Sequence, residues 1–156
     1  MSSPGSVLIV VHPGSCCGSA NLTIGRSDAR ASREGLISEL RKWSGDIAVI
    51  DGEFSDELPL YPVLNEALVG AISRNTNAGY KAARVEGDAA DEFDQAAAAT
   101  ALIQKFGLSP HSHSIKLTGA WLEQVHEDGC IDDVFDVMTA AGFSVDVLDS
   151  AFTIHE

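Results

Sequence analysis

Residues 7–21 read Val-Leu-Ile-Val-Val-His-Pro-Gly-Ser-Cys-Cys-Gly-Ser-Ala-Asn, and the rest of the chain is arranged around them. The five branched aliphatic residues at positions 7–11 are typical of a strand buried on both faces of a parallel sheet. Pro13 has no N–H for a sheet ladder, so the strand is expected to end there. A loop of small residues follows, and the first 25 residues contain no Asp, Glu, Lys or Arg. Residues 7–11 are therefore predicted to form the most buried strand.

Outside this stretch, segments with helical and with strand-like spacing of apolar residues alternate along the chain. Further strands are predicted over residues 46–51, 80–85, 114–118 and 143–148, the fourth of the five strands being closed by Gly119. Helices are predicted over residues 28–43, 62–74, 89–106 and 130–141. Short strands joined by helices must cross over in parallel. We expect one α/β domain over residues 1–156, a Rossmann-like three-layer α/β/α sandwich with a central, mostly parallel sheet of about five strands.

Composition excludes several classes of protein. Of the 156 residues, 45% are hydrophobic and 21% are charged, as in ordinary globular proteins. The formal net charge of −13 argues against nucleic acid and anionic membranes as partners, because both attract clustered Lys and Arg. No apolar run reaches the roughly 20 residues of a membrane span, and the N-terminus lacks the positive region of a signal peptide. The three cysteines do not make a disulfide framework, so a cytoplasmic protein is expected.

The carboxyl ends of parallel strands meet at one edge of the sheet, where α/β proteins bind their ligands. The residues predicted to bind a small molecule at this edge are Gly14, Ser15, Cys16, Cys17, Gly18, Asp51, Glu53 and Trp121, and His12 and Asp149 are predicted to lie at the same edge. We expect residues 13–21 to shape a pocket with Trp121 and the end of the second strand. Glycines let a ligand approach the backbone; the alternative is that they only make a turn. Trp121, just past a predicted strand end, either lines the pocket or packs against a partner subunit of a homo-oligomer.

Two features of the opening loop bear on whether it binds a metal or a cofactor. Cys16 and Cys17 could bind a metal with His12, His111 or His113. However, adjacent cysteines diverge, strong zinc sites use a C-x₂₋₄-C spacing, and the chain has no second cysteine pair. The loop also lacks the Gly-Lys-Ser/Thr ending of a P-loop and the G-x-G-x-x-G of a dinucleotide site. No metal and no cofactor are expected.

Cys130 is the strongest single candidate for a catalytic residue. It follows Gly129 at a predicted helix N-terminus, where the helix dipole and free amide groups stabilise a thiolate. Four acidic residues surround it and would raise the pKa of the thiol: Glu127, Asp128, Asp132 and Asp133. Cys130 is therefore either a nucleophile or a small buried residue beside an Asp128 N-cap.

About 40 residues of the C-terminal third carry a family likeness. The chain offers Leu-Thr-Gly at 117–119, Gly-Cys-Ile at 129–131, Ala-Ala-Gly-Phe at 140–143 and Val-Asp-Val-Leu-Asp-Ser-Ala at 145–151. This series resembles the isochorismatase-like family, the cysteine hydrolases. The resemblance implies the three-layer fold and a nucleophile at Cys130. The family's catalytic Asp corresponds to His12 here, and no lysine matches the family's lysine, which would fall at about residues 84–86.

Two hypotheses of function follow. The first is a divergent isochorismatase-like module that has lost the usual triad and binds a small ligand or a partner. The second is a cysteine hydrolase acting on a small amide or a related substrate, with Cys130 as nucleophile and His12 as its base or orienting group.

Overall fold

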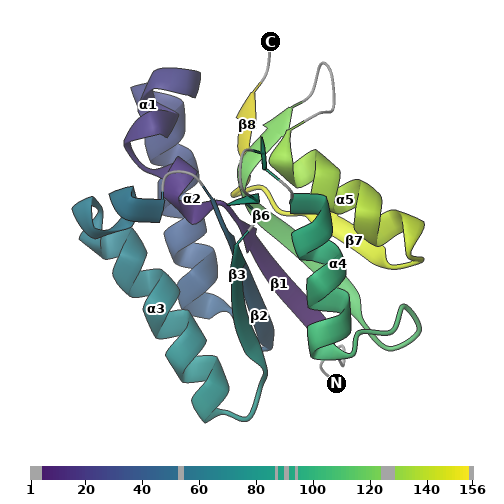
Figure 1. Ribbon diagram of the computed structural model, residues 1–156. Helices are drawn as coiled ribbons and strands as arrows, with labels where there is room; N and C mark the ends of the chain where they lie inside the picture. Colours follow the sequence, from purple (N-terminus) through teal and green to yellow (C-terminus); the bar gives the residue numbers. More distant parts are fainter. Residues whose placement is uncertain are drawn as a thin grey trace.

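The computed structural model describes residues 5–52, 55–86, 88–89, 92–93, 95–123 and 129–154 (Figure 1). Six strands form one sheet in which every pairing is parallel. Five of them lie in the order β3-β2-β1-β6-β7, and the sixth, β8, pairs with the later part of β6, which continues past the residues paired with β7. These strands are β1 (Ser6–Val11), β2 (Asp46–Asp51), β3 (Ala82–Glu86), β6 (Ser114–Glu123), β7 (Ser144–Val147) and β8 (Phe152–Ile154). The predicted fold class is confirmed.

Helices cover both faces of the sheet (Figure 1). They are α1 (Gly18–Ile24), α2 (Arg26–Lys42) and α3 (Pro62–Asn77) on one face, and α4 (Gln95–Phe106) and α5 (Cys130–Ala140) on the other. The described part of the chain also contains the 3-10 helices η1 (Pro13–Cys16) and η2 (Ser55–Leu60), and a small hairpin of β4 (Asp88–Ala89) and β5 (Glu92–Phe93).

β1 lies at the centre of the sheet, between β2 and β6. All five of its residues from Val7 to Val11 are fully buried, as predicted. Because side chains alternate along a strand, Val7, Ile9 and Val11 join the core with α4 and α5, and Leu8 and Val10 join the core with α2 and α3. The strand is therefore apolar on both faces because each face meets its own layer of helices.

Three predicted boundaries were wrong. The fourth predicted strand does not end at Gly119, because β8 gives the extension of β6 a second partner, pairing Ala120 with Phe152 and Glu123 with Ile154. The helix predicted from residue 89 begins at Gln95, since residues 88–89 pair with 92–93. The opening loop is short, because α1 already begins at Gly18.

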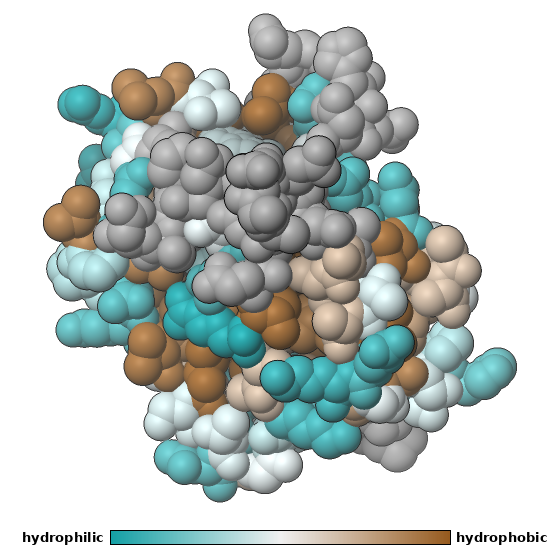
Figure 2. Space-filling model, in the orientation of Figure 1, coloured by the Kyte–Doolittle hydropathy of each residue, from teal (hydrophilic) through white to brown (hydrophobic). Residues whose placement is uncertain are grey.

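Few large apolar side chains are exposed on the described part of the surface. The exposed large apolar residues among those described are Leu22, Leu60, Val63, Val69 and Tyr80. On the face in Figure 2, apolar side chains are interspersed with hydrophilic ones. Within the described residues, no helix combines the length and the apolar composition needed to cross a membrane.

Candidate functional site

The order of the strands creates one topological switch point. From β1 the chain adds β2 and then β3 on one side, and later adds β6 and then β7 on the other side. Ligands of open α/β sheets bind beyond the carboxyl ends of the strands at such a point. Here it lies between β1 and β6, where Val11 pairs with Gly119. The residues that leave these two strands are therefore the candidates for a site.

His12 leaves β1 in a constrained position. Its backbone is left-handed, with φ of 47°, its N–H donates to the Ile50 carbonyl at 2.7 Å, and only 2% of the residue is exposed. The imidazole fills the space beside Gly52: a Cβ on Gly52 would lie 2.6 Å from His12 Cδ2. Glycine at position 52 is thus what allows the ring to lie across the end of β2.

Asp51, the last residue of β2, is buried and forms an ion pair that the sequence analysis missed. Arg84 on β3 donates from Nε to Asp51 Oδ2 at 2.6 Å and from Nη2 to Oδ1 at 3.0 Å. Asp51 is in register with Glu86, so Arg84, two residues earlier, lies on the same face of the sheet. Strand alternation is the signal that could have found this pair. Glu53 lies outside the described residues.

The two thiols of the opening loop are inside the protein. Cys16 and Cys17 are fully buried, and their Sγ atoms lie 3.8 Å from the carbonyl oxygens of His12 and Pro13. Burial, followed by the charge of Glu57, raises the pKa of Cys17 to about 11, although Arg33 opposes the shift. Burial also raises the pKa of Cys16 well above its usual value. Both side chains are therefore neutral thiols at physiological pH.

The polar groups of this loop find partners within the protein. The N–H groups of Ser15 and Cys17 donate to backbone carbonyls of η1 and its cap, and the N–H of Gly18 donates to Glu57 Oε1 at 3.0 Å. Arg33 on α2 donates from Nε to the carbonyl of Cys16 at 2.9 Å and from Nη2 to that of Cys17 at 3.0 Å. Gly14 is buried in η1. A pocket shaped by the loop stays a prediction.

Trp121 lies within β6 and not past its end, because the strand continues to Glu123. It is partly buried and packs on the apolar cluster that includes Cys16 and Cys17. Its ring meets Phe152 edge-on, with the centroids 6.2 Å apart. The structure thus brings Trp121 and the opening loop into one apolar cluster.

Cys130 is the first residue of α5 and is partly exposed. The preceding Gly129 caps the helix, and a Cβ there would lie 2.2 Å from the Trp121 carbonyl oxygen, so the start of α5 lies against the backbone of β6. Burial, then Asp133 and to a smaller extent Asp132, raises the pKa of Cys130 to about 11; backbone hydrogen bonds from Trp121 and Cys130 itself oppose the shift. Cys130 is therefore a neutral thiol near pH 7.

Asp132 joins two elements at this place. Its Oδ2 accepts the N–H of Gly129 at 3.0 Å and the N–H of Glu123 at 2.9 Å. The sequence indicated Asp132 only as a charge beside Cys130. Its second bond reaches a residue of another element, which helical spacing does not predict.

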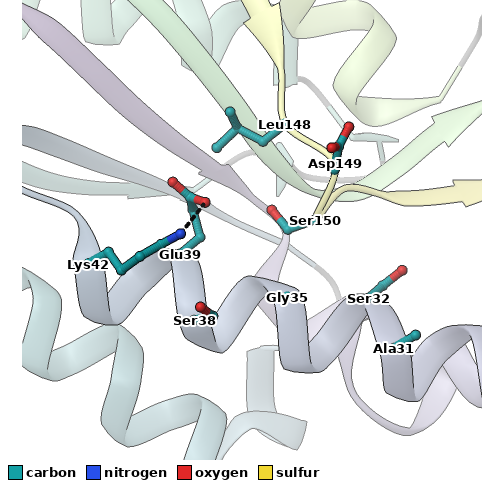
Figure 3. Close-up of a pocket in the computed structure, with 9 residues that line it drawn as sticks. All are labelled: Ala31, Ser32, Gly35, Ser38, Glu39, Lys42, Leu148, Asp149 and Ser150. Carbon is teal, nitrogen blue, oxygen red and sulfur yellow. Dashed lines mark ion pairs between the residues drawn. The ribbon is translucent and has the colours of Figure 1, made fainter.

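A groove of about 460 Å³ lies apart from these residues, between α2 and the turn that follows β7 (Figure 3). Its lining residues are Ala31, Ser32, Gly35, Ser38, Glu39, Lys42, Leu148, Asp149 and Ser150. The hydroxyl of Ser150, one of these residues, lies 2.7 Å from that of Thr118. It contains none of the residues predicted to bind a ligand. Among the described residues, no group of three or more His, Cys, Asp or Glu side chains is arranged to hold a metal.

No protein-family model, no curated protein and no solved structure matches this chain. The likeness to isochorismatase-like hydrolases therefore stays a proposal.

Proposed function

We propose that the protein binds a small molecule at the carboxyl edge of its sheet, as a divergent isochorismatase-like module that has lost the usual catalytic residues. The observation that carries this is the switch point itself. His12 leaves β1 there, Trp121 extends β6, and Cys130 starts a helix against Trp121. In open α/β sheets this is the place where ligands bind.

The state of Cys130 favours binding over catalysis. A cysteine nucleophile acts as a thiolate, and such cysteines have a pKa below the usual value because cations or helix N-termini stabilise the anion. Cys130 has the helix N-terminus, but burial and Asp133 raise its pKa to about 11. A thiol with this pKa contributes contact area and a weak hydrogen bond to a ligand.

The charges around Cys130 favour an uncharged ligand. Asp132 and Asp133 are both acidic and both act on the thiol. Arg84, near the carboxyl edge, is already paired with Asp51. A negatively charged ligand beside Cys130 would be repelled, whereas a small amide would not.

A cysteine hydrolase acting on a small amide is the second candidate. One observation favours it: backbone hydrogen bonds from Trp121 and Cys130 act on the sulfur. Backbone N–H groups of this kind stabilise a thiolate, the form in which a cysteine acts as a nucleophile.

A thermal-shift screen with small amides, carboxylic acids, nucleotides and divalent metals tests the binding proposal. We expect amides to raise the Tm, because a ligand at 100 times its Kd stabilises the folded state by about 2.7 kcal/mol. His12→Asn, which tolerates a left-handed backbone, should abolish the shift. The matched variant His111→Asn, at an exposed position, should retain it. An unchanged shift in His12→Asn, or no shift with any class, would contradict the proposal.

Cys130→Ser separates the two candidates. A binding module should keep most of its thermal shift in this variant, because serine preserves the shape of the side chain. A hydrolase should convert the stabilising amide to its acid, detectable by mass spectrometry, and Cys130→Ser should abolish that conversion. Turnover by the wild-type protein would overturn the purely binding function.

A further inference from the structure

We propose that Asp132 is a positioning residue, whose carboxylate clasps the end of β6 to the start of α5 and thereby sets the depth at which Cys130 lies. The inference rests on the proposed function only in taking Cys130 as part of the site. The clasp itself consists of the two hydrogen bonds that Asp132 Oδ2 accepts from Gly129 and Glu123.

The first of these bonds is ordinary helix capping. Asp132 is the third residue of α5, and Gly129 is its N-cap. An acidic side chain at the third position commonly reaches back to the N–H of the N-cap residue. This bond alone would satisfy one free amide of the helix end and would say nothing about β6.

The second bond makes the carboxylate a link between elements. Glu123 is the last residue of β6, nine positions earlier in the chain, and its N–H lies 2.9 Å from the same oxygen. Hydrogen bonds to a charged acceptor are shorter and stronger than those between neutral groups. One oxygen atom therefore holds the point where the chain leaves the sheet and the point where it enters the helix.

Cys130 is held between fixed neighbours as a result. On one side Gly129 touches the carbonyl of Trp121 so closely that a Cβ would not fit, and on the other side Ile131 is fully buried. This close contact between Gly129 and Trp121 requires that β6 and α5 stay together. The clasp is a side-chain contact that joins their two ends.

Two uncharged variants of Asp132 distinguish the effect of its two hydrogen bonds from the effect of its negative charge. Asp132→Asn and Asp132→Ala remove the same negative charge, but asparagine keeps an acceptor oxygen for the two amides and alanine keeps none. Asp133→Asn removes a nearby charge and leaves both clasp bonds in place. Of the causes that raise the pKa of Cys130, burial is the largest. Loss of the clasp should therefore make the thiol more acidic and more accessible, even though its backbone hydrogen bonds weaken.

The experiment measures labelling of Cys130 by iodoacetamide at pH 8, followed on its peptide by mass spectrometry. We expect Asp132→Ala to react about tenfold faster than Asp132→Asn, the equivalent of one pKa unit. Asp132→Asn should react like Asp133→Asn. Cys16 and Cys17, both fully buried, should stay unlabelled in every variant and report that the fold is intact.

Hydrogen exchange of the Gly129 and Glu123 amides is the second measurement. Both should exchange at least tenfold faster in Asp132→Ala than in Asp132→Asn. Equal labelling and equal exchange in these two variants would overturn the clasp. If Asp132→Ala does not melt cooperatively, Asp132→Val takes its place, because valine likewise has no acceptor oxygen, and the same difference from Asp132→Asn is expected. No ligand is present in either assay, so a failed thermal-shift screen would leave this result unchanged.

Discussion

Gly119 fixes the closest approach between the two strands of the switch point. Its φ is +104°, and a Cβ would lie 2.1 Å from the carbonyl oxygen of Val11 and 2.7 Å from its nitrogen. The obstacle is backbone, which cannot rotate away as the end of a side chain can. Position 119 thus needs glycine for two independent reasons, the sign of φ and the space available.

Replacing Gly119 by alanine should lower the free energy of unfolding by about 3 kcal/mol, since backbone strain and overpacking each cost about 1–3 kcal/mol. Gly107→Ala should lose only about 1 kcal/mol, because φ there is +64° but no atom lies within 4 Å of the added Cβ. Gly70→Ala, on an exposed helical position, should gain about 0.5–1 kcal/mol. Urea unfolding measures all three. An equal loss in Gly119→Ala and Gly107→Ala would show that contact with Val11 is unimportant.

For single residues, the sequence predicted the place of a residue in a helix or strand better than it predicted which atoms the side chain contacts. Cys130 was expected at a helix N-terminus and is the first residue of α5. The N-cap is Gly129, however, and not Asp128, which lies outside the described residues. Local spacing shows that an acidic residue is near Cys130. It does not show that Asp132 bonds an amide of β6, because that contact depends on how two separate elements meet.

Arg33 joins three elements on the α2 side of the sheet. Besides the carbonyls of Cys16 and Cys17, its Nη2 donates to Asn21 Oδ1 at 3.1 Å, and its guanidinium lies 4.7 Å from the centre of the Tyr61 ring. α1 has no side-chain cap at its N-terminus and no acidic residue in its first turn. The short helix is therefore held by α2 and by packing more than by its own propensity.

Arg33→Lys should lower the free energy of unfolding by about 2 kcal/mol, because an ammonium group cannot make several directed bonds in one plane. Hydrogen exchange over α1 (Gly18–Ile24) should rise more than exchange over α2. The control is Arg30→Lys: Arg30 pairs with Glu34 at the surface, with side chains 77% and 70% exposed, so the change should stay within about 0.5 kcal/mol. Uniform exchange along the chain in Arg33→Lys would contradict a local role.

The elements missed by sequence share one property. α1 is built from Gly-Ser-Ala-Asn-Leu-Thr-Ile, which has little helical propensity, and β8 has only three residues. Each forms because a neighbour stabilises it: Arg33 and α2 hold α1, and the extension of β6 pairs with β8. Long periodic segments such as residues 28–43 and 62–74 were predicted well because their apolar faces alone indicate a helix.

At the scale of the molecule, most of the fold could be predicted from one feature of the sequence, the buried strand at residues 7–11. A strand apolar on both faces requires two layers of helices, and the structure confirms a parallel sheet between them. The order of the strands is a different kind of information. Whether β6 or β3 lies next to β1 depends on pairing between distant segments, which periodicity does not contain. The carboxyl edge could be predicted as the candidate site from sequence, but the position of the switch point between β1 and β6 follows only from the order.

The three cysteines together predict how the folded state responds to alkaline pH. The pKa of Cys17 and that of Cys130 are raised from about 9 to about 11, and burial raises that of Cys16 well above 9. Above pH 9 the unfolded chain releases these protons while the folded chain keeps them. The raised values therefore stabilise the fold fully below pH 9, and this contribution is lost as pH rises toward 11 and beyond.

Urea unfolding in the presence of a reductant at pH 8, 9, 10 and 10.5 measures this loss. Each thiol should contribute up to about 1.4 kcal/mol per pH unit to the fall in the free energy of unfolding. Cys130→Ala should remove one such contribution, and the triple variant with alanine at positions 16, 17 and 130 should remove all three, although small cavities lower its stability at every pH. The quantity compared between wild type and variants is the slope of the free energy of unfolding against pH between pH 9 and 10.5, and not its absolute value. A triple variant that loses stability as steeply as the wild type would mean that other groups cause the alkaline transition and that the thiols are not protected by burial.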